Sequence, residues 1–258
     1  MRPSTLLLLF LAACKSPPQA PAALDDLCSW LFAHALDEDP AAMDAGAAQL
    51  SAWMAAHWEE TDGGYAISAL DQATLDALDG VERHAAELAG IAVITESAHT
   101  VDEVAAAVLT VDLTEIYPAM VTYERTFHGD HDAFLTGDLA LLETEEWIHQ
   151  EIDSLIDITA DSHSWNQYLF AEADTGPSLV QRNWLVEPPV LDPAWLAASE
   201  QYTLQAFVPR EGGHFRLQAM WVVYASDAIP TDTGLRLTAD DFQHNSEYLE
   251  TWMDAHPG

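Results

Sequence analysis

The densest group of potential metal ligands in the chain lies directly after Phe127. Here His128, Asp130, His131 and Asp132 place two imidazoles and two carboxylates within five positions. Imidazole and carboxylate groups are the usual protein ligands of divalent metals. A glycine among short polar residues is also what a tight turn requires. The sequence therefore leaves a divalent metal site and a turn open for this stretch, and it favours the turn.

Arginine could hold an anion, and it is scarce, because Lys and Arg together make up only 8 of the 258 residues. By strand alternation, Arg182 shares a face with Trp184, and Arg216 shares a face with Tyr224. A cation among apolar neighbours needs a partner. Both arginines could pair with carboxylates of neighbouring strands. Alternatively, they meet across the sheet and hold the anionic group of a ligand, with Trp184, Trp221 and Tyr224 as the apolar wall.

Several well-known active-site patterns are absent from the sequence. It contains no phosphate-binding Gly-Lys-Ser/Thr loop, and Lys15 is the only lysine that could form a Schiff base. It also lacks the HExxH helix of zinc peptidases and the Gly-x-Ser-x-Gly turn of α/β-hydrolases. A carboxylate pair for glycan hydrolysis stays possible because there are 43 acidic residues, among them Glu143, Glu145 and Glu146 beside Trp147.

The charge of the chain excludes one class of partner. With 43 acidic residues against 8 basic ones, the formal net charge is −35 at pH 7. Such a chain repels phosphate backbones, so we expect no binding to nucleic acid. Because 49% of the residues are hydrophobic, the composition is that of a folded protein and not of a disordered acidic tail.

Hydrophobic periodicity divides the body of the chain into a helical part and a strand-rich part. Helical spacing covers 24–36 and about 40–58, and capping-box patterns at Ser68 and Thr100 predict two short helices. Thr238-x-x-Asp241 predicts the start of a last helix. Cys28 shares the helical spacing of the leucines around it, so we expect a small core residue there. Strands are predicted at 120–127, 152–159, 163–171, 179–186, 202–208 and 215–224.

These elements predict an α+β fold with a helical N-terminal part, an antiparallel β meander and a closing C-terminal helix. The expected bounds are 24–112 for the helical part, 113–236 for the meander and 237–256 for the helix, all within a single domain over 24–258. This order of elements resembles that of helix-grip domains. The resemblance implies a curved sheet that wraps a long C-terminal helix around an apolar cavity.

The first residues have a different character from the body of the chain. Met1-Arg2 gives a positive start, an apolar run follows to Leu11, and Leu11-Ala12-Ala13-Cys14 ends the segment. The run is too short to cross a bilayer, which takes about 20 residues. The segment resembles a bacterial lipoprotein signal peptide. The resemblance implies cleavage before Cys14, a diacylglyceryl thioether on its sulfur and acylation of its new amino group.

Lipidation would define the segments at the start of the chain and the location of the protein in the cell. Residues 1–13 would be the signal peptide, and residues 14–23 would form a lipidated cysteine and a proline-rich tether. The resemblance implies a place in the cell envelope and attachment to a membrane through the lipid. In the sorting pattern of enterobacterial lipoproteins, a non-acidic residue after the cysteine directs the protein to the outer membrane. Here that residue is Lys15, so the resemblance implies the outer membrane of a Gram-negative bacterium. We expect no cofactor except the covalent lipid, apart from the divalent metal left open above.

The sequence favours a non-catalytic, lipid-anchored envelope protein that binds a small amphipathic ligand or an envelope protein partner. Two alternatives remain open. The first is an envelope hydrolase, either carboxylate-based and acting on glycan or metal-dependent through His128 and His131. The second is a structural or adhesive lipoprotein without any pocket.

Lipidation at Cys14 predicts a defined mass for the mature chain. Mass spectrometry of protein made in a lipidating bacterial host should find a chain that starts at Cys14 and carries acyl groups, and this protein should sediment with membranes. Cys14→Ser should lose both properties. Cys28→Ala is the matched control and should remain lipidated. An unmodified Cys14, or an intact leader peptide, would contradict the prediction.

Overall fold

The computed structural model of the protein describes residues 18–37, 39–78, 83–110, 112–152, 157–224 and 230–256, so Cys14 and the segment before it lie outside the described residues. The helices are α1 (Leu24–His34), α2 (Ala41–His57), α3 (Gln72–Asp76), α4 (Val101–Thr110), α5 (His131–Leu135) and α6 (Thr231–Ala255). The strands are β1 (Tyr65–Ile67), β2 (Ala89–Ser97), β3 (Met120–Phe127), β4 (Leu141–Ile152), β5 (Ile158–Ala173), β6 (Gly176–Leu185), β7 (Val190–Asp192), β8 (Ala198–Arg210) and β9 (Gly213–Tyr224). Short 3-10 helices are η1 (Trp58–Thr61), η2 (Ala85–Glu87) and η3 (Leu113–Glu115).

All of these strands join one antiparallel sheet in the order β1-β2-β9-β8-β6-β5-β4-β3, and β7 pairs with β5. The strands from β3 to β6 follow one another along the chain as a meander, which confirms the predicted α+β class. The helical first part also contributes two strands that the sequence did not predict, because β1 and β2 come from it and β2 pairs with β9. Of the strand predicted at 152–159, Ile152 ends β4 and Ile158 begins β5, and residues 153–156 lie outside the described residues.

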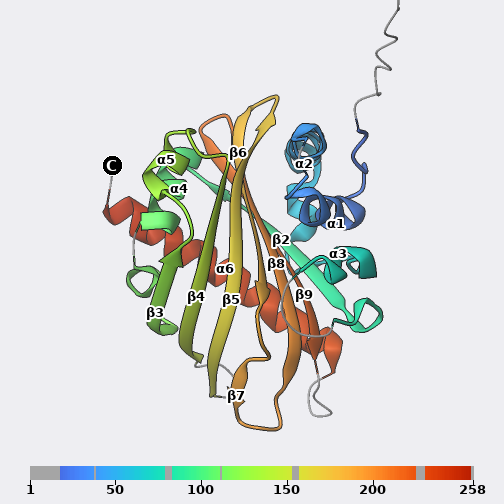
Figure 1. Ribbon diagram of the computed structural model, residues 1–258, viewed down its shortest axis with the longest axis vertical. Coiled ribbons are helices and arrows are strands. Elements are labelled where there is room, and N and C mark those ends of the chain that lie inside the picture. The colour runs from blue at the N-terminus through green and yellow to red at the C-terminus, as the bar shows by residue number, and fades with distance from the viewer. Residues whose placement is uncertain are drawn as a thin grey trace, which may run out of the picture.

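Helices cover both faces of the sheet (Figure 1). The long C-terminal helix α6 runs obliquely across one side, and α1 and α2 lie on the other side near one end. We call these sides the α6 face and the α1 face. A long last helix across an antiparallel sheet is the order of elements that the helix-grip resemblance implied.

The last helix α6 begins earlier than the sequence predicted. It begins at Thr231, so Thr238 is not its cap and instead donates a hydrogen bond from Oγ1 to the carbonyl of Gly234.

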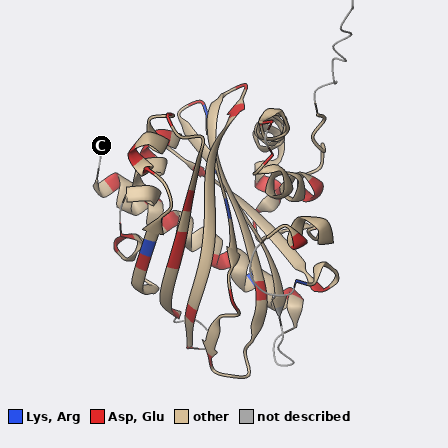
Figure 2. Cartoon of the chain, in the orientation of Figure 1, with Lys and Arg blue, Asp and Glu red and all other residues tan. Residues whose placement is uncertain are grey.

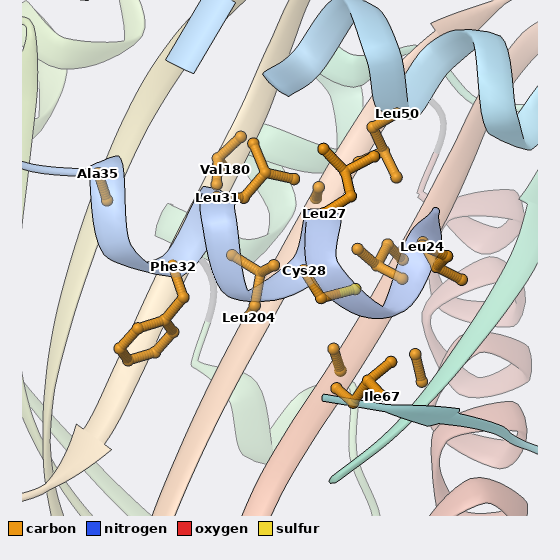
Figure 3. Packing of buried hydrophobic residues seen from close by; sticks show 14 of the residues in the cluster. Leu24, Leu27, Cys28, Leu31, Phe32, Ala35, Leu50, Ile67, Val180 and Leu204 are labelled. Atoms are coloured by element: carbon orange, nitrogen blue, oxygen red, sulfur yellow. The ribbon is translucent and has the colours of Figure 1, made fainter. Parts of the chain in front are cut away.

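The core on the α1 face explains why α1 forms where the sequence predicts it. Leu24, Leu27, Cys28 and Leu31 follow helical spacing, and all four are fully buried against the sheet and α2 (Figure 3). Burial of one such leucine contributes roughly 1.5–3 kcal/mol. Burial also raises the pKa of the Cys28 thiol far above its ordinary value. Cys28 is therefore a core residue, as predicted, and not a nucleophile.

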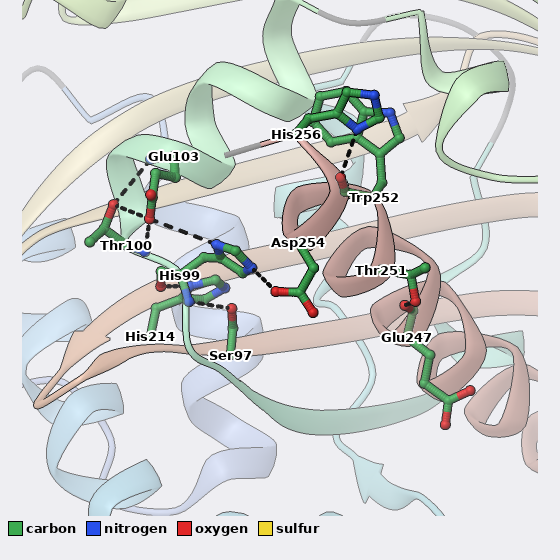
Figure 4. Close-up of polar contacts among 10 residues, drawn as sticks. All are labelled: Ser97, His99, Thr100, Glu103, His214, Glu247, Thr251, Trp252, Asp254 and His256. Atoms are coloured by element: carbon green, nitrogen blue, oxygen red, sulfur yellow. Dashed lines mark hydrogen bonds and ion pairs between the residues drawn. The ribbon is translucent and has the colours of Figure 1, made fainter. Parts of the chain in front are cut away.

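Hydrogen bonds and an ion pair connect the start of α4, the end of α6 and β9 (Figure 4). The predicted capping box is present, because the Thr100 backbone N–H donates to the Glu103 carboxylate at 2.7 Å and Thr100 Oγ1 accepts from the Glu103 N–H at 3.3 Å. The imidazole of His99 lies 3.2 Å from Asp254 of α6. Beside it, His214 of β9 donates from Nδ1 to the His99 carbonyl at 2.7 Å. These contacts tie three elements together at one end of α6.

His214 is a neutral histidine inside this junction. It is only 1% exposed, and burial lowers its pKa from about 6.5 to about 4. The neutral ring is therefore favoured in the folded state. The stability that depends on this neutral ring is fully present above pH 6.5, the ordinary value, and is lost as the pH falls towards 4.

The variant His214→Gln should remove this pH dependence. Relative to the variant, the wild-type protein should lose about 3 kcal/mol of unfolding free energy between pH 7 and pH 4, because each factor of ten in proton affinity corresponds to about 1.36 kcal/mol. Denaturant titrations at pH 7, 5.5 and 4 measure this difference. His256→Gln is the control, because this residue is exposed at the end of α6. Parallel stability curves for wild type and His214→Gln would show that His214 does not titrate in this range.

Candidate functional site

A cavity of about 730 Å³ lies between the α6 face of the sheet and α6 itself. Its floor comes from β4, β5, β6, β8 and β9, and one wall comes from α6. Asp241, His244 and Tyr248 line it from α6 and are exposed, so the cavity opens to solvent along the helix. Its volume falls in the range of small-molecule sites, about 300–1,000 Å³. The alternative of a structural or adhesive lipoprotein assumed no pocket, so this cavity counts against it.

The middle of the cavity floor is a row of side-chain amides. Strand register places Gln181 of β6 opposite Gln205 of β8, and Gln205 opposite Gln218 of β9. Gln205 donates to Gln181 at 3.1 Å, and Gln181 donates to Asn166 of β5 at 2.8 Å. The floor is therefore polar, whereas the helix-grip resemblance implied an apolar cavity. Gln218 does not continue this chain of hydrogen bonds and instead donates to the Phe242 carbonyl of α6 at 2.8 Å.

Arg216 of β9 stands at one end of this amide row. It is 4% exposed, and its Nη2 donates to Gln205 Oε1 at 2.8 Å and to Tyr117 Oη at 3.4 Å. Its Nη1 donates to the Asn245 carbonyl of α6 at 3.3 Å. Within the described ranges no carboxylate lies within 4.0 Å of this guanidinium. The hydrogen-bond partners that the described structure gives this buried cation are all neutral groups, and burial of a cation without a counter-charge is costly.

The cavity becomes less polar with distance from Arg216. Along β9 its lining changes from Arg216 and Gln218 to Met220 and Val222. Near β7 the lining is largely aliphatic, with Ile152, Ile158, Leu185, Leu191 and Leu196. The cavity thus has a polar end, where Arg216 lies, and an apolar end.

A second arginine of the same cavity already has a counter-charge. Arg125 of β3 and Glu146 of β4 form an ion pair with Nε and Oε1 2.9 Å apart, and both side chains are about 95% buried. Arg125 Nη1 also donates to the Val108 carbonyl at 2.8 Å. Because Arg125 is neutralised, Arg216 is the cation of the described cavity wall that lacks an anion.

The expectation that Arg182 and Arg216 converge on one ligand is wrong. Arg182 pairs with Leu204, and Leu204 pairs with Ala219. Ala219 and Arg216 are three residues apart on one strand, so their side chains point to opposite faces of the sheet. The sequence showed alternation within each strand but not the register between strands, and the register decides which side chains meet.

Arg182 lies on the α1 face, where it lines a separate cavity of about 440 Å³ together with Trp184. It donates to Gln167 at 2.7 Å and to the Phe32 carbonyl at 2.8 Å, and burial lowers its pKa to about 10. Trp221 is fully buried in the core of this face and donates to the Ser68 carbonyl at 2.7 Å, so it lines neither cavity. The side chain of Tyr224 lies outside the described part of the structure.

The side chains of His128, Asp130, His131 and Asp132, at the start of α5, do not converge on a common point. Asp130 caps α5 by accepting from the backbone N–H groups of Asp132 and Ala133. His128 stacks on Trp165 and His131 stacks on Phe127. In the described part of the chain, no three His, Cys, Asp or Glu side chains are grouped so as to hold a metal ion. His128 and Gly129 form a bend before α5, whereas His131 and Asp132 lie in its first turn.

Sequence reasoning missed the amides that form the cavity floor, namely Asn166, Gln181 and Gln205. A signal for them was present, because polar residues recur at every second position of strand-like runs, as in Gln201, Thr203 and Gln205. Such a pattern is typical of a solvated strand face as well as of a polar cavity. Only the position of α6 distinguishes the two.

Comparisons with known proteins find solved structures that resemble part of this chain and no match in sequence. No known protein family and no curated protein matches the sequence. An uncharacterised protein from Rhizobium leguminosarum is 12% identical, with a TM-score of 0.40 over 66% of this chain and 97% of that chain. A START superfamily protein from Mycobacterium smegmatis is 11% identical, with a TM-score of 0.38 over 64% and 97%. Because these scores are low, the site has to be judged from its own residues.

None of the helices in the described ranges combines the length and the apolar character of a membrane-spanning segment.

The Arg125–Glu146 pair predicts a large effect of a single substitution. Glu146→Gln would leave Arg125 buried without its counter-charge, and the loss of one member of a buried pair costs about 3–5 kcal/mol. Denaturant unfolding should show this loss. Glu145→Gln, one position away on the other face of β4, is the control and should cost less than about 1 kcal/mol. Equal losses in the two variants would contradict a special role for the buried pair.

Proposed function

We propose that this protein binds a small anionic amphipathic molecule in the cavity beneath α6. The observation that carries the proposal is Arg216, a buried cation at the polar end of the cavity that lacks a carboxylate partner in the described structure. The anionic group of the ligand would accept hydrogen bonds from Arg216 and supply the missing counter-charge. Its apolar part would lie along the aliphatic residues near β7.

The shape and polarity of the cavity support an amphipathic ligand over a small inorganic anion. A cavity of about 730 Å³ is far larger than one anion needs, and its aliphatic end would remain wet if only the charged end were filled. The acidic surface of the chain also repels anions at long range. Burial of apolar surface would offset that repulsion at about 25 cal/mol per Å².

The proposal includes a place for the protein in the cell envelope. Its support is the lipoprotein-like segment that ends at Cys14, and the tether of residues 14–23 would hold the domain close to a membrane. Stable attachment takes two or more acyl chains, which the proposed modification provides. A binding protein at a membrane surface would meet amphipathic molecules of the kind that the cavity fits.

Binding is proposed without catalysis. In the first cavity, Glu146 is held by Arg125 and by Thr144, whose Oγ1 donates to it at 3.1 Å. A carboxylate so engaged is poorly placed to move a proton to or from a substrate. An envelope hydrolase that uses a carboxylate pair or a metal remains the alternative, and detection of ligand turnover would favour it.

The charge requirement can be tested with two detergents that share a tail. Dodecanoate should bind more tightly than dodecyltrimethylammonium in calorimetric titrations below the critical micelle concentrations. Arg216→Gln should weaken dodecanoate binding about tenfold to a hundredfold, because a hydrogen bond to a charged group contributes about 1.5–3 kcal/mol. Arg216→Lys should retain part of the affinity, because it keeps the charge.

Arg182→Gln is the matched control for this test. It removes an equally buried arginine from the opposite face of the same sheet and should leave dodecanoate binding unchanged. Circular dichroism checks that each variant is folded. Equal affinity for the two detergents, or full dodecanoate affinity in folded Arg216→Gln, would overturn the proposal.

A further inference from the structure

The cavity on the α1 face is separate from the site beneath α6 and differs from it in chemistry. It has a volume of about 440 Å³, and its floor is formed by β4, β5 and β6. Leu36, after α1, and Ala77 and Leu78, after α3, form an apolar side of it. The other lining residues are Glu143, Glu145, Trp165, Gln167, Arg182, Trp184 and Val186.

One row of the floor alternates hydrogen-bond acceptors and donors. Strand register places Glu143 opposite Gln167, and Gln167 opposite Arg182. Gln167 Nε2 donates to Glu143 at 2.6 Å, and Arg182 Nε donates to Gln167 at 2.7 Å. The row thus presents a carboxylate, an amide and a guanidinium in one line across three strands, and these planar groups hold each other in place.

The adjacent row carries aromatic rings. Glu145, Trp165 and Trp184 lie opposite one another on the same three strands. The imidazole of His128 stacks on Trp165 with ring centroids 4.7 Å apart, and Trp165 Nε1 points to Glu143 at 3.4 Å. Trp165 is half-buried, so part of its indole is open to the cavity. An indole face attracts C–H groups that carry partial positive charge.

From these two rows we infer that the α1-face cavity is a second binding site and that it takes a neutral saccharide. Arg182 in the wall disfavours a cationic ligand, and Glu143 with Glu145 disfavours an anionic one. A hydroxyl group both donates and accepts, so a sugar can donate to the carboxylates and accept from the guanidinium. The C–H face of a sugar ring fits the adjacent indole.

The space between the two charges favours a neutral ligand over a free amino acid. The backbones that carry Glu143 and Arg182 are two strands apart, about 10 Å at roughly 4.8 Å per strand, and the amide of Gln167 already bridges their charged groups. The ammonium and carboxylate of an amino acid would have to displace that amide to pair with both groups. A chain of two or three sugar rings can span this row while it covers Trp165.

Calorimetric titration with cellotriose, chitotriose and maltotriose tests the inference, together with NMR of the tryptophan indole N–H groups. At least one trisaccharide should bind and shift the Trp165 resonance. Glu143→Gln, which removes a charge and keeps the shape, should lower that affinity at least fivefold. Trp165→Ala should lower it at least tenfold. Trp195→Ala is the matched control, because this tryptophan is 44% exposed and lies outside the wall of the cavity.

The two sites can be separated by the same variants. Arg216→Gln should leave trisaccharide binding intact, and Glu143→Gln should leave dodecanoate binding intact, so failure of one proposal does not imply failure of the other. The saccharide site is overturned if no trisaccharide binds at about 10 mM, on the order of a hundredfold above a dissociation constant of roughly 0.1 mM. Unchanged affinity in folded Glu143→Gln and Trp165→Ala, or binding of free L-leucine in place of the sugars, would also overturn it.

Discussion

Alternation of side chains along shared strands is the constraint on which the rest of this structure depends. On β9, Phe215, Leu217, Ala219 and Trp221 pack into the core beneath α1 and α2, whereas Arg216, Gln218, Met220 and Val222 line the cavity beneath α6. The same strand therefore builds a dry core on one side and a mixed, open cavity on the other. A shift of one residue in register would exchange the two sets.

The helices on the two faces of the sheet differ in where they pack closely against it. The α1 face is closed where α1 and α2 pack against β8 and β9, and it stays partly open over β4 to β6, where Trp147 is 39% exposed. On the other face, α6 packs on β2 through Ala239 and leaves the middle of the sheet to the cavity. Each cavity thus lies where helices cover only part of a sheet face that carries polar side chains.

Two buried arginines of this acid-rich chain, Arg182 and Arg216, are held by neutral groups within the described structure. Figure 2 shows Asp and Glu on helices, strands and loops, and only a few positions with Lys or Arg. Arg125 has a carboxylate at 2.9 Å, but the partners found for Arg182 and Arg216 are amides, hydroxyls and backbone carbonyls. Neutral partners orient a guanidinium without cancelling its charge. The charge then remains available to a ligand, and this links the packing of the sheet to the proposed binding functions.

The sequence by itself determined the class of the fold, the first helices, the strand at 120–127 and the burial of Cys28. These features depend on local periodicity and capping, which neighbouring residues specify. It did not reveal β2 or β4, since Ala89–Ser97 and Leu141–Ile152 are strands through pairing with distant partners. The separation of Arg182 from Arg216, the amide row and both cavities were decided by strand register and by the positions of the helices that cover each face. These are relations between segments far apart in the chain, and no local pattern encodes them.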